Sequence, residues 1–219
     1  MKLIRRPRLW PIRTSVIVPC AAKHAALLPS LLDELDRQTV HPDEVVIAIS
    51  GTRSAPTFNR RAYRVHTLID TGIAFAGRNR NRASDAAIGD VLIYQDADDV
   101  PHPQRIEIAK VLFGQFFVEH LIHTYVTSSA SPAWRTQRFG ADAAVKYAHY
   151  EPYSYTYEFH NGNAITTREV FRKVRWPEDI RRGQDVVYNH AVRARFPHRM
   201  TRLQIPLLAY RQHLSTTAA

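Results

Sequence analysis

The sequence contains one cysteine, Cys20, so an internal disulfide framework is excluded. It also lacks any run of the roughly 18–20 apolar residues that a membrane-spanning helix needs. The basic residues 1–13 are not followed by an apolar segment that could form the core of a signal peptide. Internal repeats, low-complexity tracts and linkers are absent from the sequence. We therefore expect one domain over residues 1–219, in a cytoplasmic protein that is either free or peripheral to a membrane.

Charge is the most unusual bulk property of the chain. It has 30 Lys and Arg against 20 Asp and Glu, which gives a net charge of +10. Such an excess favours anionic partners, among them nucleotides, acidic lipid head groups, nucleic acid and acidic glycans, although a basic solvated surface explains it equally well. With 45% hydrophobic residues in 219, the chain can also build a substantial core.

Apolar patterning alternates between strand and helix through the first half of the chain. The predicted strands are 15–18, 44–50, 64–70 and 91–94, and the predicted helices are 27–35, 74–88 and 103–117. The second half is less regular, with helical patterns at 166–174 and 184–196 and a strand at 203–210 that Pro206 interrupts. This alternation predicts an α/β fold with a mostly parallel central sheet and helices on both of its faces.

Three residues lie at the carboxyl ends of predicted strands: Pro19, Ser50 and Asp96. Because the carboxyl ends of parallel strands share one edge of a sheet, we expect these residues to lie close together. Ligands of open α/β sheets bind at this edge, so the sequence predicts the functional site there.

An acidic cluster follows the fourth predicted strand. Asp96, Asp98 and Asp99 fall within four residues, and in an extended segment Asp96 and Asp98 would project to the same side. Converging carboxylates repel one another unless a cation or a proton intervenes. Hard divalent ions accept such oxygen ligands and leave positions for substrate phosphates. The alternative is structural, because aspartate also favours turns and helix N-caps.

Four stretches in this order resemble the nucleotide-sugar half of GT-A glycosyltransferases, especially family 2. They are the strand at 15–19, Gly-Arg-Asn-Arg-Asn at 77–81, Ala-Ala-Ile-Gly-Asp at 86–90 and the DXD-like Asp-Ala-Asp-Asp at 96–99. The resemblance implies a GT-A fold with a nucleotide-sugar-binding half at about 14–115 and an acceptor-binding half at about 116–219. It also implies Mn²⁺ or Mg²⁺ on Asp96 and Asp98.

The resemblance further implies individual contacts to the nucleotide sugar, at Pro19, Cys20, Ala21, Ser50, Arg78 and Asp96. The family usually has an aspartate that contacts the base where this chain has Ser50. The donor is therefore expected to be a UDP-, GDP- or TDP-linked sugar, with the base left open.

In the second half, the resemblance assigns Asp185 as the base that deprotonates the acceptor hydroxyl, with inversion at the anomeric carbon. Gln184 takes the position of a family glutamate. The remaining expected contacts are Asn161, Gly162 and Trp176 on the acceptor side, and His213 at the metal. The acceptor is expected to be a glycan, a lipid-linked molecule or a protein.

Three other functions compete with sugar transfer. A nucleotidylyltransferase would need a glycine-rich loop after the first strand, but residues 19–24 contain no glycine. A phosphatase usually carries its paired aspartates on the first strand, whereas here they follow the fourth. A non-catalytic binder of nucleic acid or of a membrane surface would use Arg5, Arg6 and Arg8; no nucleic-acid-binding module is recognisable, so nucleic acid is not an expected partner.

Overall fold

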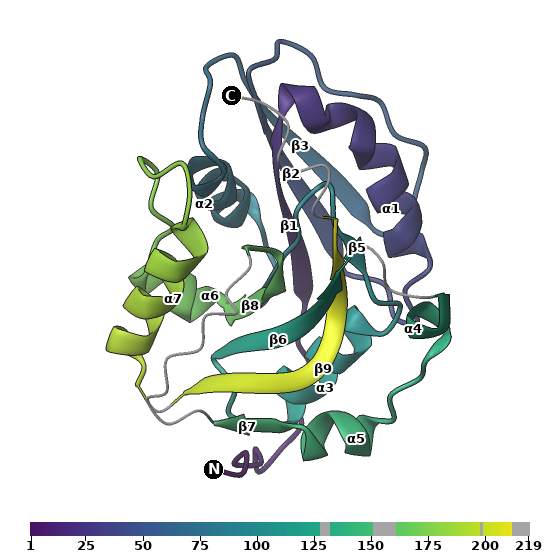
Figure 1. Cartoon of the computed structure of the whole chain (residues 1–219), viewed down its shortest axis with the longest axis vertical. Coiled ribbons are helices and arrows are strands. Elements are labelled where there is room, and N and C mark those ends of the chain that lie inside the picture. Colours follow the sequence, from purple (N-terminus) through teal and green to yellow (C-terminus); the bar gives the residue numbers. More distant parts are fainter. Residues whose placement is uncertain (128–131, 151–160, 198, 212–219) are drawn as a thin grey trace.

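The computed structural model describes residues 1–127, 132–150, 161–197 and 199–211 (Figure 1). The strands are β1 (Thr14–Ala21), β2 (Glu44–Ser50), β3 (Arg64–Asp70), β4 (Val91–Tyr94), β5 (Val100–Pro101), β6 (His120–Thr127), β7 (Ala148–Tyr150), β8 (Ala164–Thr167) and β9 (Met200–Tyr210). The α-helices are α1 (Leu28–Asp36), α2 (Ala76–Ala86), α3 (Arg105–Gln115), α4 (Pro132–Thr136), α5 (Ala141–Lys146), α6 (Arg168–Lys173) and α7 (Gln184–Arg195), with 3₁₀ helices η1 (Ala22–Leu27) and η2 (Asn161–Asn163).

All the described strands belong to one mixed sheet. Its order is β3-β2-β1-β4-β8-β6-β9-β5, and β7 pairs with β9. The first four strands in this order are parallel, as is β6 with β9, while the four antiparallel ladders are short. The predicted α/β fold with a mixed, mostly parallel sheet is therefore confirmed.

Helices cover both faces of this sheet because neighbouring strand residues point in opposite directions. On β1, Val16 and Val18 pack in the core cluster that contains the buried side chains of α1 and α3. Ile17, between them, packs in the second cluster, with the buried side chains of α2, α6 and α7. Figure 1 shows the two helical layers on either side of the strands.

The register of the parallel strands brings their carboxyl ends together. Ala21 of β1 pairs with Ser50 of β2, which in turn pairs with Asp70 of β3. On the other side of β1, Ile17 pairs with Tyr94 of β4, so the acidic cluster begins beside the end of β1. The predicted convergence of the strand ends is thus present in the fold.

The second half departs from its sequence pattern in three places. Thr166 and Thr167, predicted as the start of a helix, belong to β8 instead, because this strand is bonded on both sides by β4 and β6. β6 (His120–Thr127) is not among the strands predicted from the sequence. Finally, β9 continues through Pro206, where its ladder with β6 shifts register. Among the helices of the described segments, none is long and apolar enough to cross a membrane.

Candidate nucleotide and metal site

The acidic cluster forms a tight turn between β4 and β5. The amide of Asp99 donates to the carbonyl of Asp96 at 3.3 Å, and the Gln95 side chain donates to the carbonyls of both residues at 3.0 and 3.1 Å. One carboxylate oxygen from each of Asp96, Asp98 and Asp99 lies within 4.8 Å of the others. The three side chains converge because the chain turns at 97–98 and not, as the sequence pattern suggested, because the segment is extended.

Burial and repulsion between carboxylates make Asp98 and Asp99 hard to ionise. The pKa of Asp98 is raised by burial and by the charge of Asp96. The pKa of Asp99 is raised well above its ordinary value by burial and then by Asp96 and Asp98, against an opposing hydrogen bond from the Arg211 amide. Such a cluster favours a bound cation, since a positive charge removes the repulsion.

Arg80 contacts the cluster directly. Its side chain is 1% exposed, and Nη2 lies 2.6 Å from Oδ1 of Asp96. Nη1 of the same guanidinium donates to Oε1 of Gln184 at 3.0 Å. Its flat face lies 4.6 Å from the centroid of the Trp176 ring. Arg80 therefore fixes the orientation of Asp96 and links the cluster to the first residue of α7.

A second buried arginine, Arg105, bonds to the residues that precede and surround the turn. Arg105 of α3 donates to the carbonyls of Tyr94 and Gly162 and to the Gln95 side chain. Complete burial lowers the pKa of Arg105 to about 9, which still leaves it charged at neutral pH. Arg80 and Arg105 together offset two of the three carboxylates, so the cluster retains a net negative charge when all three are ionised.

Gly162 lies against the underside of the cluster. A Cβ at this position would sit 3.1 Å from Oδ2 of Asp99 and 3.6 Å from the amide of Asp96. Gly162 was expected to contact the acceptor, but the neighbour that its backbone approaches closely is the acidic cluster.

A pocket of about 320 Å³ opens beside the cluster, at the carboxyl ends of β1 and β4. Basic side chains line much of it, and Asp96 and Asp98 form one wall. Its lining residues are Pro19, Cys20, Ala21, Lys23, His24, Ala74, Phe75, Ala76, Asn79, Arg80, Asp96, Ala97, Asp98 and Arg181. All three residues predicted at the end of the first strand, 19–21, therefore line it together with two of the aspartates.

Ser50 lies beneath this pocket and does not line it. It is 3% exposed; the Asn79 side chain donates to its hydroxyl at 2.9 Å and to the Cys20 carbonyl at 3.0 Å. The Ser50 hydroxyl donates onward to the carbonyl of Ala74 at 3.4 Å. Its visible role is to hold the walls of the pocket together through Asn79, a residue that sequence reasoning did not identify.

Arg78 lies outside the pocket lining. Its side chain is 52% exposed and 3.5 Å from the carboxylate of Asp70, at the end of β3. Two residues along a helix are separated by about 200°, so Arg78 and Arg80 face opposite ways. The predicted nucleotide contact was Arg78, but the arginine of α2 that contacts the cluster is Arg80, because the phase of the helix turns Arg78 away.

The same helix, α2, also holds the segment that precedes α7. The Asn81 side chain donates to the carbonyl of Trp176 at 2.9 Å and accepts from its amide at 3.0 Å. A Cβ on Gly77 would lie 1.9 Å from the carbonyl oxygen of Pro177, so only glycine allows this approach. These contacts fix the segment that leads to Gln184, whose side chain is 3% exposed, and to Asp185, which is 9% exposed in the first turn of α7.

Trp176 does not offer a face to a sugar. It is 1% exposed, and its ring stacks on Tyr188 with centroids 4.0 Å apart and an interplanar angle of 9°. Arg80 covers the ring as well. The prediction of an acceptor contact through this side chain is therefore wrong, because the ring is enclosed by α2 and α7.

Two other predicted site residues, Asn161 and His213, have side chains outside the described part of the chain. Asn161 begins η2, but its side chain is not among those described. His213 lies outside the described residues, so its expected position at the metal stays a prediction.

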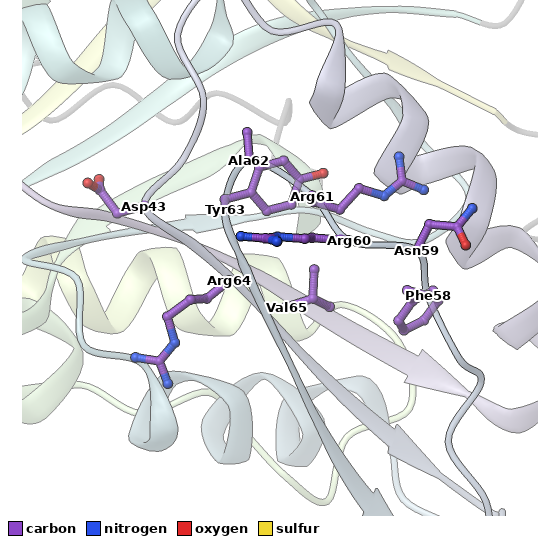
Figure 2. A pocket seen from close by; sticks show the side chains of 9 residues that line it. All are labelled: Asp43, Phe58, Asn59, Arg60, Arg61, Ala62, Tyr63, Arg64 and Val65. Atoms are coloured by element: carbon purple, nitrogen blue, oxygen red, sulfur yellow. The ribbon is translucent and has the colours of Figure 1, made fainter.

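A larger pocket of about 600 Å³ lies at the opposite end of the sheet, where β2 and β3 begin (Figure 2). It lacks converging carboxylates: Asp43, the one acid in its lining, accepts hydrogen bonds from Thr14 and from Lys110. Its size therefore does not make it the better candidate for a metal or diphosphate.

The chain matches the family model described as Glycosyl transferase family 2 over residues 15–175. No curated protein sequence matches it significantly. The family match includes the acidic cluster, α2 and the segment up to Arg175, and ends before α7.

Solved structures with a similar fold include S. aureus TarS 1–349 in complex with UDP, with a TM-score of 0.67 and 15% identity over 91% of this chain and 60% of that chain. The same protein with UDP-GlcNAc gives 0.64 and 14%, over 94% and 62%. The mannosyltransferase PcManGT from Pyrobaculum calidifontis, in complex with GDP-Man and Mn²⁺, gives 0.57 and 19%, over 94% and 58%. The chain thus spans about 60% of the length of these proteins.

Proposed function

Because the chain belongs to glycosyl transferase family 2, we propose that it transfers a sugar from a nucleoside-diphosphate sugar to an acceptor hydroxyl. The observation that carries the proposal is the position of Asp96 and Asp98. They form one wall of a basic pocket at the carboxyl ends of the parallel strands, beside the end of β1. A diphosphate needs both positive side chains and a divalent cation held by carboxylates, and this pocket offers the ligands for each.

The donor set fits Mn²⁺ or Mg²⁺. Its three oxygen donors lie within 4.8 Å of one another, and carboxylate oxygens are the ligands that these ions prefer. Asp96 and Asp98 would hold the ion, with Asp99 behind them and His213 as a further ligand. A bound divalent ion neutralises the charge that develops on the departing diphosphate. The structure of PcManGT, which contains Mn²⁺, supports this choice.

The pocket walls suggest how the donor is oriented. Residues 19–21 and Asn79 would border the nucleoside, while Lys23, Arg80 and Arg181 supply positive charge toward the diphosphate. Ser50 is engaged by Asn79, so it would shape the pocket for the base without facing it. UDP, GDP and TDP sugars all remain candidates; TarS and PcManGT were solved with uridine and guanosine nucleotides respectively.

Asp185 is the proposed general base. It opens α7, where the N-terminus favours a negative charge, and it is adjacent to Gln184, which Arg80 links to Asp96. A base in this place would remove the proton from an acceptor hydroxyl as its oxygen attacks the anomeric carbon, which gives inversion. Asn161 stays a proposed contact on the acceptor side, and the acceptor would be a glycan, a lipid-linked molecule or a protein.

Turnover of a donor panel tests the proposal. UDP-, GDP- and TDP-linked sugars are incubated with the protein and Mn²⁺, and release of the nucleoside diphosphate is measured with and without acceptor mixtures. We expect one base to be favoured, with activity lost in a chelator and in Asp98→Asn. Asp185→Asn should still bind the donor yet lose transfer. The proposal is refuted if the protein releases no nucleoside diphosphate from any donor and if donor binding is unchanged by Mn²⁺ and by Asp98→Asn.

A further inference from the structure

The N-terminal segment forms a fixed strap at the end of the sheet opposite the nucleotide pocket. The amides of Arg6 and Trp10 donate to carbonyls at the end of α3 at 2.7 and 2.9 Å, and the amide of Phe117 donates to the carbonyl of Ile4 at 3.0 Å. Figure 1 shows the N-terminus at the bottom of the molecule, close to β7 and α5. The strap is therefore part of the folded surface.

Large apolar side chains project from this strap into solvent. Ile4 is 59% exposed and Leu9 is 77% exposed, and Phe117 beside the strap is 38% exposed. Neighbouring side chains of the same segment, such as Leu3 and Ile12, pack against the core instead. The exposed group is thus a surface feature of a segment whose other apolar residues already contribute to stability.

The same strap carries uncompensated positive charge. Residues 1–13 contain five Lys and Arg and no acid. Lys2, Arg5 and Arg8 are exposed, and within the described parts of the chain they form no ion pair. Arg6 is different, because its guanidinium packs over the rings of Trp10 and Phe117 at 4.8 and 4.7 Å.

The positive charge continues along this end of the sheet. Ser15, Glu44 and Arg64 pair in one row across β1, β2 and β3, so the exposed Arg60 and Arg64 of the pocket in Figure 2 lie at the same end as the strap. Five acids lie near this end, and each is bonded to a neighbour. Asp43 accepts from Thr14 and Lys110, and Glu44 from the Ser15 hydroxyl. The acids of the cleft beside Arg6 and Phe117 form ion pairs: Asp90 with Arg13, Glu119 with Arg199 and Glu169 with Lys173.

We propose that this N-terminal surface, formed by Lys2, Ile4, Arg5, Arg8, Leu9 and Phe117, docks on an anionic membrane. Apolar side chains that enter the boundary between head groups and acyl chains, flanked by cations that face anionic lipids, match the two requirements for binding at a membrane interface. Nucleic acid would use the cations but not the exposed Ile4 and Leu9. A second copy of the chain would bring two positively charged straps together, which their charge opposes.

Docking in this way leaves the nucleotide pocket in water. Pro19–Ala21 lie at the far end of β1, an eight-residue strand that spans about 26 Å at roughly 3.3 Å per residue. Membrane binding should therefore need neither nucleotide nor divalent cation. The inference is independent of the proposed function, and each can fail without the other.

Co-sedimentation of the whole chain with vesicles tests the inference. Vesicles of phosphatidylcholine with about one third phosphatidylglycerol are compared with pure phosphatidylcholine, in EDTA and over a range of salt. We expect binding to the anionic vesicles alone, weakening steeply with salt. The double variant Arg5→Ser, Arg8→Ser should weaken vesicle binding about thirtyfold, because each cation removed weakens it about fivefold. Ile4→Ser with Leu9→Ser should weaken it at least about fivefold at unchanged charge.

Arg53→Ser with Arg182→Ser is the matched control, because it removes two exposed arginines from the nucleotide-pocket end and gives the same net charge. It should keep binding within about threefold of wild type. Equal binding to neutral and anionic vesicles would overturn the proposal. Equal weakening of vesicle binding in the two double-arginine variants would overturn it as well. A dimer in solution that Ile4→Ser with Leu9→Ser dissociates, without vesicle binding, would assign this surface to a second copy instead. All six positions are exposed, so circular dichroism should show folded variants.

Discussion

Replacing Arg80 with methionine tests whether the guanidinium organises the acidic cluster, and Arg78→Met provides a control on the same helix. Arg80 is 1% exposed and bonded to Asp96 at 2.6 Å and to Gln184 at 3.0 Å. Removing one partner of a buried pair costs about 3–5 kcal/mol, and the 22% exposure of the Asp96 side chain reduces this to about 2–3 kcal/mol. Arg78, 52% exposed and 3.5 Å from Asp70, should contribute less than about 0.5 kcal/mol.

Two assays separate the structural effect from the functional one. Urea unfolding followed by circular dichroism gives the free energy of unfolding, and release of nucleoside diphosphate from the preferred donor gives activity. We expect Arg80→Met to lower activity by about 100-fold, because Asp96 loses the contact that fixes it, while Arg78→Met retains most of it. The reasoning is refuted if the two variants lose similar stability and activity, or if Arg78→Met is the more damaging.

Three further changes test other parts of the site. Gly77→Ala should lower the free energy of unfolding in urea by about 1–3 kcal/mol, because the added Cβ would lie 1.9 Å from the Pro177 carbonyl oxygen. Gly140→Ala is the control: its Cβ would meet no atom within 4 Å, so it should cost about 0.5 kcal/mol or less. Asn81→Ala should lower the free energy of unfolding by about 2–4 kcal/mol, because the buried amide and carbonyl of Trp176 lose their hydrogen-bond partner. The variant should also lower kcat more than it alters the KM for the donor. A variant as stable as the wild type would contradict this prediction. Asp98→Asn should raise the metal-free melting temperature at neutral pH. A pKa raised in the folded state means that folding takes up protons, so the stability that the variant gains over wild type in EDTA should shrink as pH falls from about 7.5 toward 5. The comparison is with the variant because buried His102, His120 and His123, whose pKa values are lowered, oppose this trend equally in both proteins.

The sequence predicted the parts of the site that depend on local pattern and sheet topology. Parallel strands had to bring residues 19–21 and the acidic cluster to one edge, and the pocket lies there. The choice between Arg78 and Arg80 depended on the rotation of α2, which a helix with so few apolar residues does not reveal. Asn79 was missed because its partners, the Cys20 carbonyl and the Ser50 hydroxyl, are distant in the sequence.

The second half was less predictable because tertiary contacts determine its local structure. The four residues of β8 follow no strong pattern and are held by ladders on both sides. Trp176 was expected on the acceptor side from the resemblance alone, yet Arg80 and Tyr188 enclose its ring. Gly162 showed a need for close approach, but the sequence could not show that the partner is Asp99.

The most direct test of the central claim is a thermal-shift panel of UDP, GDP and TDP with and without Mn²⁺, on wild type and Asp98→Ala. A nucleotide at a hundred times its dissociation constant should stabilise the native state by about 2.7 kcal/mol. We predict that one base raises the melting temperature of the wild type only when Mn²⁺ is present, and that the variant shows no such rise. Equal shifts in the variant, or the same shift in EDTA, would contradict a cation held between Asp98 and the diphosphate.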